Sequence, residues 1–213
     1  MEKSSTKQEI LRVSLDLFST YGFEATPISK IAEMVGIKKA SLYSHFPSKQ
    51  AILDSLIAEA YAMYEKRSIF ATANWNDPTY TEDKINMTCD DLIKMIAGQV
   101  NYIVYDPIIS KTRKMLTIEQ FQNQQMKDMQ TKQNYTDVMN FFKGLIQFLI
   151  KNGKISGDDI EIMAAELCLP VSVWINLCDR EPSRQKEITE LIERHVKHFF
   201  SIHQAKKIES IIK

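Results

Sequence analysis

The chain has 213 residues, and its 27 lysines and arginines balance 27 aspartates and glutamates, so net charge neither indicates nor excludes a nucleic-acid partner. The sequence has no uninterrupted apolar run of about 18 residues, and we therefore expect no membrane-spanning segment and no membrane partner. Cys89, Cys168 and Cys178 lack Cys-x-x-Cys spacing and follow no signal peptide, which predicts a reduced, cytoplasmic protein rather than a disulfide framework.

The first predicted helix begins near Thr6 and ends at Gly22. Thr6 and Glu9 have the spacing of a capping box, and glycine commonly ends a helix. The apolar residues between them recur at helical spacing. They form a face that would pack under the next two helices.

Residues 25–46 are typical of two short helices joined by a tight turn. Thr26 is a suitable N-cap, and Pro27 suits the first position of a helix whose apolar residues follow the i, i+3, i+4, i+7 pattern. Gly36 stands where the chain must turn, because glycine tolerates the left-handed conformation. The segment predicts a helix-turn-helix with its reading motif over residues 27–46.

The second of these helices, over residues 38–46, has two distinct faces. Leu42 and Phe46 stand four residues apart and would pack into the core. The segment 36–49 contains three lysines and one histidine but no aspartate or glutamate. Lysines that neutralise phosphates supply much of a protein's affinity for DNA. A basic, hydroxyl-rich face of this size suits a helix that lies in a major groove.

Residues 6–55 resemble the N-terminal domain of the TetR (tetracycline repressor-like) transcriptional regulators. Two residues depart from the family pattern: Ser14 replaces a small apolar residue, and Lys38 replaces the serine or threonine that often caps the recognition helix. The matching residues, of which the Leu-Tyr-x-His-Phe-x-x-Lys string is the most specific, are Ile10-Leu11, Leu15, Leu17-Phe18, Gly22-Phe23, Ala25-Thr26, Ile31-Ala32, Val35-Gly36-Ile37, Leu42-Tyr43, His45-Phe46-Pro47 and Lys49.

The resemblance implies DNA contacts for eight residues of this segment: Thr26, Lys38, Lys39, Ser41, Tyr43, Ser44, His45 and Lys49. Tyr43, His45 and Lys49 would contact phosphates, whereas Lys39 and the two serines would lie nearest the bases. Lysine can donate to guanine O6 and N7, which makes Lys39 the best candidate for base readout. Structural alternatives stay open: Tyr43 as a packing aromatic, His45 as a structural histidine, and Lys49 as a solvated helix start.

Residues 48–213 predict a larger helical domain for ligand binding and dimerisation, which follows a DNA-binding domain of residues 1–47. Residues 71–81 are predicted as a loop. Apolar spacing predicts helices over approximately 48–64, 82–105, 108–122, 135–151, 159–177 and 183–202, with a polar stretch between 122 and 135. No segment shows sustained strand alternation, so the expected fold class is all-α.

The last two predicted helices have broad apolar faces. Two such helices from each chain are what a homodimeric four-helix bundle needs, and the resemblance implies the same mode of dimerisation. A two-fold dimer would present two recognition helices to a palindromic operator on double-stranded DNA. The alternative is that these faces pack only within one chain.

A small-molecule site is expected between helices of the larger domain, because methionine and aromatic side chains suit an apolar or amphipathic ligand. Ordinary core packing is the alternative role for each of them, and the sequence identifies no effector. The candidate lining residues are Met95, Tyr102, Met115, Phe121, Phe142 and Trp174.

The sequence contains no glycine-rich nucleotide loop, nucleophile elbow or zinc-hydrolase helix, so we expect no enzymatic activity, no cofactor and no metal site. The prediction is therefore a transcription regulator, most simply a repressor released from its operator by a ligand. Two other classes stay open. One is a ligand-independent or architectural DNA-binding protein, and the other is a small-molecule binder without a DNA function.

Overall fold

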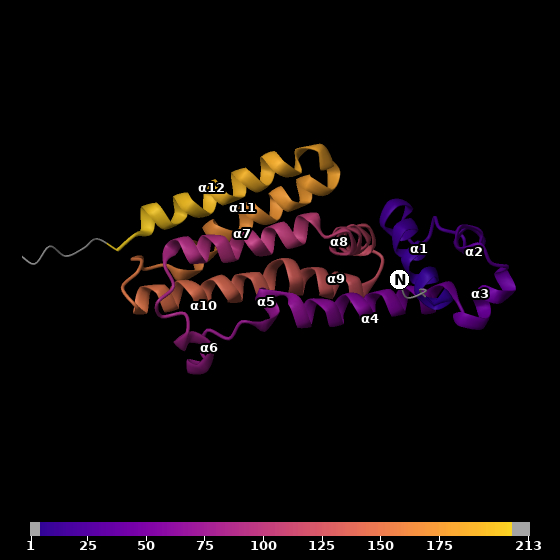
Figure 1. Ribbon diagram of the computed structural model, residues 1–213, viewed down its shortest axis with the longest axis horizontal. Helices are drawn as coiled ribbons and strands as arrows, with labels where there is room; N and C mark the ends of the chain where they lie inside the picture. Colours follow the sequence, from indigo (N-terminus) through magenta and orange to yellow (C-terminus); the bar gives the residue numbers. More distant parts are fainter. Residues whose placement is uncertain (1–4, 206–213) are drawn as a thin grey trace, which may run out of the picture. The chain divides into compact units, whose positions relative to one another are not determined.

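The computed structural model describes residues 5–205, and these residues are predominantly helical (Figure 1). The one isolated β-bridge among them joins Ile155 and Gln204. The expected all-α class is therefore confirmed. The chain forms two compact units: unit 1 runs to Arg67 and resumes over Tyr105–Lys132, and unit 2 comprises Ser68–Val104 and the residues from Gln133 onward.

Unit 1 contains the helices α1 (Thr6–Tyr21), α2 (Ile28–Val35), α3 (Lys39–His45), α4 (Lys49–Arg67), α8 (Pro107–Glu119) and α9 (Gln124–Thr131). The capping box of α1 lies one residue earlier than predicted. The Gln8 N–H donates to Ser5 Oγ at 3.3 Å, and the Ser5 N–H donates to Gln8 Oε1 at 3.1 Å. Ser5 has the extended backbone of an N-cap, whereas Thr6 is already helical.

The apolar core of unit 1 joins the N-terminal helices to α8 and α9. Phe18 of α1 and Leu42 of α3 are completely buried, and so are Met115 of α8 and Met126 of α9 in the same cluster. The helix-turn-helix residues alone therefore do not complete this core. Side chains of α8 and α9, more than 60 residues later in the sequence, also belong to it.

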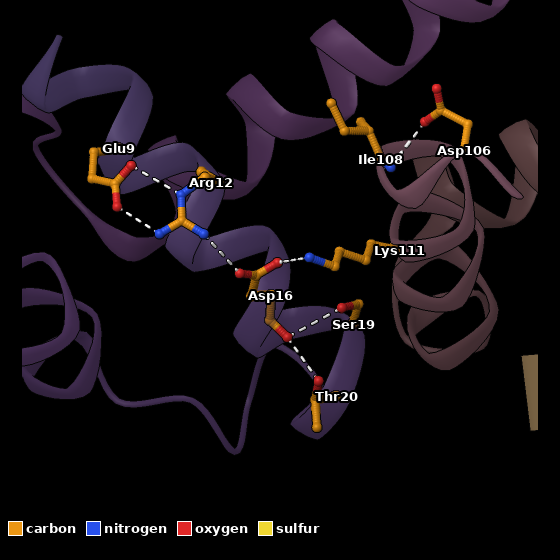
Figure 2. Close-up of polar contacts among 8 residues, drawn as sticks. All are labelled: Glu9, Arg12, Asp16, Ser19, Thr20, Asp106, Ile108 and Lys111. Carbon is orange, nitrogen blue, oxygen red and sulfur yellow. Dashed lines mark hydrogen bonds and ion pairs between the residues drawn. The ribbon is translucent and has the colours of Figure 1, made fainter. Parts of the chain in front are cut away.

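The start of α8 is determined by the Asp106-Pro107 pair. The Asp106 carboxylate accepts a hydrogen bond from the Ile108 N–H at 2.9 Å (Figure 2). It also accepts one from the Ile109 N–H at 3.0 Å, and Pro107 occupies the first turn. Proline at this position loses no helical hydrogen bond. The break predicted at this pair is therefore confirmed as a helix boundary.

Unit 2 contains α5 (Ile69–Thr72), α6 (Pro78–Glu82), α7 (Cys89–Tyr105, whose last residue belongs to unit 1), α10 (Asp137–Lys151), α11 (Ile160–Arg180) and α12 (Gln185–His203). A π-helical segment (Lys132–Thr136) precedes α10, and a 3-10 turn (Pro182–Arg184) precedes α12. Figure 1 shows α11 and α12 running side by side.

Three of the predicted boundaries are wrong. The predicted loop contains α6, which Asp77 caps by accepting the Thr79 N–H at 2.9 Å. The helix predicted from residue 82 begins only at Cys89. The predicted polar stretch contains α9, whose buried residues are few and include Met126. A helix with so narrow an apolar side gives little periodic signal.

Two close contacts in unit 2 involve a glycine and a proline. Trp75 packs directly over Gly144 of α10, so there is no space for a side chain at position 144. In α11, Pro170 lacks the N–H that would donate to the Glu166 carbonyl. His195 of α12 fills this role, because its Nε2 lies 3.1 Å from the carbonyl oxygens of both Glu166 and Leu167.

Candidate nucleic-acid interface

The turn between α2 and α3 has the geometry that its sequence predicts. Gly36 adopts φ +79° and ψ 28°, in the left-handed region, and its N–H donates to the carbonyls of Ala32 and Glu33. The Ile37 N–H also donates to Ala32, at 3.0 Å. These bonds satisfy carbonyls at the end of α2, and the conformation is one that favours glycine.

The predicted N-cap of α2 at Thr26 is wrong. Pro27 occupies the N-cap position and makes no side-chain capping bond. Thr26 is buried, and its hydroxyl donates instead to the Gly22 carbonyl at 2.8 Å. The Thr26 side chain therefore stabilises the turn between α1 and α2, and it does not lie with the exposed candidate residues.

Helix α3 separates its buried and exposed faces as predicted. Leu42 is completely buried, and Phe46, which ends the helix, is 3% exposed. Lys38 is the N-cap of α3 but makes no side-chain capping bond, in agreement with its departure from the family pattern. The structure brings together six exposed candidates on or next to α3: Lys38, Lys39, Ser41, Tyr43, Ser44 and His45.

The exposed face of α3 is cationic and rich in hydroxyl groups. Among the described residues, neither Lys38 nor Lys39 has an ion-pair partner, and the Lys39 ammonium lies 5.9 Å from the Tyr43 ring centroid. Tyr43 is 44% exposed and is therefore not a core aromatic. The Ser44 hydroxyl donates to the Ser41 carbonyl at 2.7 Å, which leaves its oxygen able to accept. This face can donate to phosphates and base edges.

Lys49 lies differently from the other candidates. It begins α4 and is only partly exposed. Its Nζ donates to the Phe23 carbonyl at 2.7 Å and lies 4.1 Å from the centroid of the Phe23 ring. Lys49 is therefore bound to the turn between α1 and α2.

Two residues near this surface are absent from the sequence prediction. Glu119, at the end of α8, is 6% exposed, and its Oε1 accepts the Phe23 N–H at 2.7 Å. Lys7, in the first turn of α1, lies 5.4 Å from the centroid of the Phe46 ring and adds a cation beside the end of α3. No sequence spacing relates Glu119 to Phe23, so the sequence could not have indicated this contact. Lys7 could have been included as a candidate, because it is a cation in the first turn of the predicted helix that precedes the reading motif.

The charges on α1, unlike those on α3, are paired. Figure 2 shows Arg12 between two acids: it donates to Glu9 at 2.6 and 2.9 Å and to Asp16 at 3.2 Å. Lys111 of α8 donates to the other oxygen of Asp16 at 2.5 Å. The Arg12 hydrogen bond also holds the pKa of the Glu9 carboxyl below its ordinary value. This surface of α1 offers fewer free donors to DNA than α3 does.

The segment that forms this surface matches known proteins. Residues 10–56 match the family model of bacterial regulatory proteins of the tetR family. RutR, an HTH-type transcriptional regulator of Escherichia coli (strain K12), is 39% identical over 56 residues, which are 26% of this chain and 26% of RutR. IcaR, the negative transcriptional regulator of the biofilm operon icaADBC in Staphylococcus aureus (strain Newman), is 43% identical over 51 residues, 24% of this chain and 27% of IcaR.

A solved structure extends the likeness to nearly the whole chain. The SmeT–triclosan complex has a TM-score of 0.65 and 15% identity, and the match covers 96% of this chain and 94% of that one. SmeT is the repressor of the Stenotrophomonas maltophilia multidrug efflux pump SmeDEF. Residues 10–56 are therefore a segment of the TetR family type. The likeness to SmeT concerns the fold, and the curated relatives are matched over about a quarter of their length.

The candidate pocket residues are divided between the two units of the chain. In unit 1, Met115 is completely buried in the core, and Phe121 is 84% exposed. In unit 2, Met95 and Trp174 pack, partly buried, against the core that contains Phe142. Tyr102, also in unit 2, has a buried hydroxyl that lacks a hydrogen-bond partner among the described residues.

Two cavities of the described residues are lined by other side chains. One, of about 110 Å³, lies between α7 and α12 of unit 2, and its lining includes Ile93, Asn101 and Glu190. The other, of about 400 Å³, lies between α4 and α9 of unit 1 and is lined by Ile57, Ala58, Tyr61, Gln125, Asp128, Met129 and Lys132. Neither contains a residue of the predicted pocket set.

Helix α11 exposes an apolar stripe. Ile162 is 61% exposed, Leu169 is 40% exposed and Val173 is 63% exposed, and their spacing of seven and four residues places them on one face. By length and composition α11 could also cross a bilayer, which the sequence prediction did not anticipate because acids interrupt its apolar run. A single helix of this kind does not indicate a membrane protein, since apolar packing helices have the same composition.

Proposed function

We propose that this chain is a homodimeric, sequence-specific DNA-binding transcription regulator, and that it represses from a palindromic operator until a small apolar or amphipathic ligand releases it. The observation that carries the proposal is the exposed face of α3. Lys38 and Lys39 have no ion-pair partner among the described residues. The buried side chains of Leu42 and Phe46 anchor α3 to the core of unit 1. A short, acid-free helix of this kind fits a major groove.

The residue roles follow from where the side chains lie. Lys39, with Ser41 and Ser44, would read base edges, because all three are exposed on α3. Lys38, Tyr43 and His45 would contact phosphates on either side. The side chains of Thr26 and Lys49 donate to backbone carbonyls of the α1–α2 turn. These two residues would therefore hold the DNA-contacting residues in position rather than contact DNA themselves.

The proposed dimer uses the last two helices. The α11 stripe of Ile162, Leu169 and Val173 exposes apolar surface that a second copy of the chain would bury, and Ile202 of α12 is 55% exposed as well. Burial of apolar area is the main favourable term in such association. A two-fold dimer would present two α3 helices to the two halves of a palindrome.

The proposed effector site lies among the helices of the 48–213 region, with residues 1–47 as the DNA-binding region. Support comes from the fold shared with SmeT, whose solved complex contains triclosan. The buried, unpartnered hydroxyl of Tyr102 is a second support, because buried polar groups normally have a partner. Met95, Phe142 and Trp174 are the accompanying candidates in unit 2, and Met115 and Phe121 are those in unit 1.

The ligand would act by binding one conformation of the dimer better than the other, and its effect on DNA affinity is limited to that difference. Repression, rather than activation, is proposed because the relatives include a negative regulator, IcaR, and a repressor, SmeT. The protein would act in the cytoplasm, where its operator is accessible.

Selection of bound sequences from a random duplex library, with the full chain at moderate salt, tests the proposal. We expect one palindrome, reduced base preference for Lys39→Ala, and a uniform loss of affinity for Tyr43→Phe. Lys186→Ala is the matched control, because it removes the same charge from an exposed position of α12.

Two results would contradict the proposal. Retention of all duplexes without a shared motif would favour a ligand-independent, architectural DNA-binding protein. Retention of none would favour a small-molecule binder without a DNA function.

A further inference from the structure

Phe23 is held by charged side chains from two distant helices. It lies in the turn between α1 and α2, from which the reading motif departs. Its N–H donates to Glu119 of α8 at 2.7 Å, and its carbonyl accepts from Lys49 of α4 at 2.7 Å. An acid therefore holds one polar group of this residue, and a base holds the other.

The surroundings of Phe23 fit this arrangement closely. Glu119 is 6% exposed, and a buried carboxylate is costly unless it accepts hydrogen bonds. Gly22 leaves room for it: a Cβ at that position would lie 3.1 Å from Glu119 Oε1, and the residue has φ +83°. The Phe23 ring packs edge-on against Phe18, with centroids 5.3 Å apart, and the Lys49 ammonium lies 4.1 Å from its centroid.

We infer that Glu119 and Lys49 are positioning residues for DNA recognition. Together with Phe23 they form what we call the Phe23 clamp, which fixes the turn that leads into α2 and α3. The inference rests on the proposed function. It assigns Lys49 a role different from the phosphate contact that the family resemblance implies, because its ammonium is bound to the Phe23 carbonyl and ring.

The clamp predicts an effect of Glu119 that opposes simple electrostatics. Removing an acid makes a protein more positive, and long-range attraction to DNA then increases. Loss of the Glu119 carboxylate would nevertheless leave the partly buried Phe23 N–H without its acceptor. The turn would shift, and α3 would lose its position. The expected result is weaker operator binding.

Glu119→Ala, Glu119→Gln and Glu24→Ala test this in the full chain. Glu24 is the matched control, because it lies next to Phe23 and is exposed, so its loss changes the charge equally. We expect Glu119→Ala to lower operator affinity about tenfold or more, as a lost hydrogen bond to a charged group does. Glu119→Gln keeps an oxygen acceptor and should retain most of the affinity, and Glu24→Ala should lose none. Operator binding by Glu119→Ala equal to that of Glu24→Ala would overturn the inference.

The salt dependence of binding distinguishes the two roles of Lys49. Removal of a phosphate contact lowers the slope of log affinity against log salt by about 0.9. We expect this decrease for Lys38→Ala, whereas Lys49→Ala should lose affinity at an unchanged slope. The double variant Glu119→Ala/Lys49→Ala should lose no more than the weaker-binding single variant, because both break one clamp. A lower slope for Lys49→Ala, together with multiplying losses, would overturn its positioning role.

Hydrogen exchange at the Phe23 amide tests the clamp without DNA. We expect slow exchange in the wild-type chain and in Glu119→Gln, and faster exchange in Glu119→Ala, with helix content unchanged by circular dichroism. Equal exchange in wild type and Glu119→Ala would show that Glu119 does not hold this turn. If the wild-type chain binds no duplex, the proposed function fails, and the exchange result still decides whether the clamp exists.

Discussion

Two helical glycines of unit 2 should respond in opposite directions to the same substitution. Gly144 lies in α10, and a Cβ there would lie 2.7 Å from Trp75 Cδ1 and 2.8 Å from Trp75 Cβ. Trp75 cannot easily move, because its ring packs against Tyr80 with centroids 5.3 Å apart and against Phe141 and Phe148 with centroids 5.5 Å apart. Gly98 of α7 has nothing within 4 Å of the equivalent position.

The expected magnitudes follow from two terms. Replacing a glycine by alanine inside a helix stabilises it by about 0.5–1 kcal/mol. Forcing an extra methyl group into a packed core costs about 1–3 kcal/mol. Gly98→Ala should show only the first term, and Gly144→Ala should show both. The difference between the two variants is then the overpacking cost alone, about 1–3 kcal/mol in the free energy of unfolding.

Thermal unfolding at one fixed protein concentration measures this difference. For a chain of this size each kcal/mol shifts Tm by about 2–4 °C. Gly98→Ala should raise Tm slightly, and Gly144→Ala should lower it. If Gly144→Ala raises Tm as much as Gly98→Ala does, Trp75 is not packed against α10.

Three further predictions concern a thiol, an ion pair and the proposed dimer. Burial raises the pKa of the Cys168 thiol to about 11, so at pH 8 it stays protonated and iodoacetamide should label the partly exposed Cys89 first; prompt labelling of native Cys168 would contradict its burial. Lys111→Ala breaks a partly exposed pair with Asp16 and should lower the free energy of unfolding by less than about 1 kcal/mol in urea, so a larger loss would refute a surface role. Val173→Asp places a charge in the apolar stripe of α11 and should give a monomer in sedimentation, whereas an unchanged dimer would place the interface elsewhere.

The reading motif could be predicted because its signals are local. Gly36 ends α2 through its own backbone conformation, and Leu42 and Phe46 reach the core because four residues bring them to one face of α3. The exposed side chains of α3 are then those that remain. None of these steps needs a distant part of the chain.

The features that escaped prediction depend on distant or weak signals. Phe23 and Glu119 are 96 residues apart, and no periodicity relates a carboxylate to a backbone N–H at that distance. The Thr26 hydroxyl could either accept from an N–H in the first turn of α2 or donate to the Gly22 carbonyl. The conformation of the folded turn selects the second bond. Helix α9 was hidden because most of its surface is polar.

The core of unit 1 extends beyond the residues that match the family model, and this affects how the proposed DNA-binding helix is held in place. The family match ends at residue 56, yet Met115 and Leu116 of α8 are at most 1% exposed in the same core as Leu42 of α3. The matched residues would therefore make the proposed DNA contacts, whereas the position of α3 depends also on a helix outside the match. A fragment of residues 1–47 would lack these core partners and the Glu119 carboxylate. Its DNA affinity would report an incompletely packed motif, so the full chain is the species in which operator binding has to be measured.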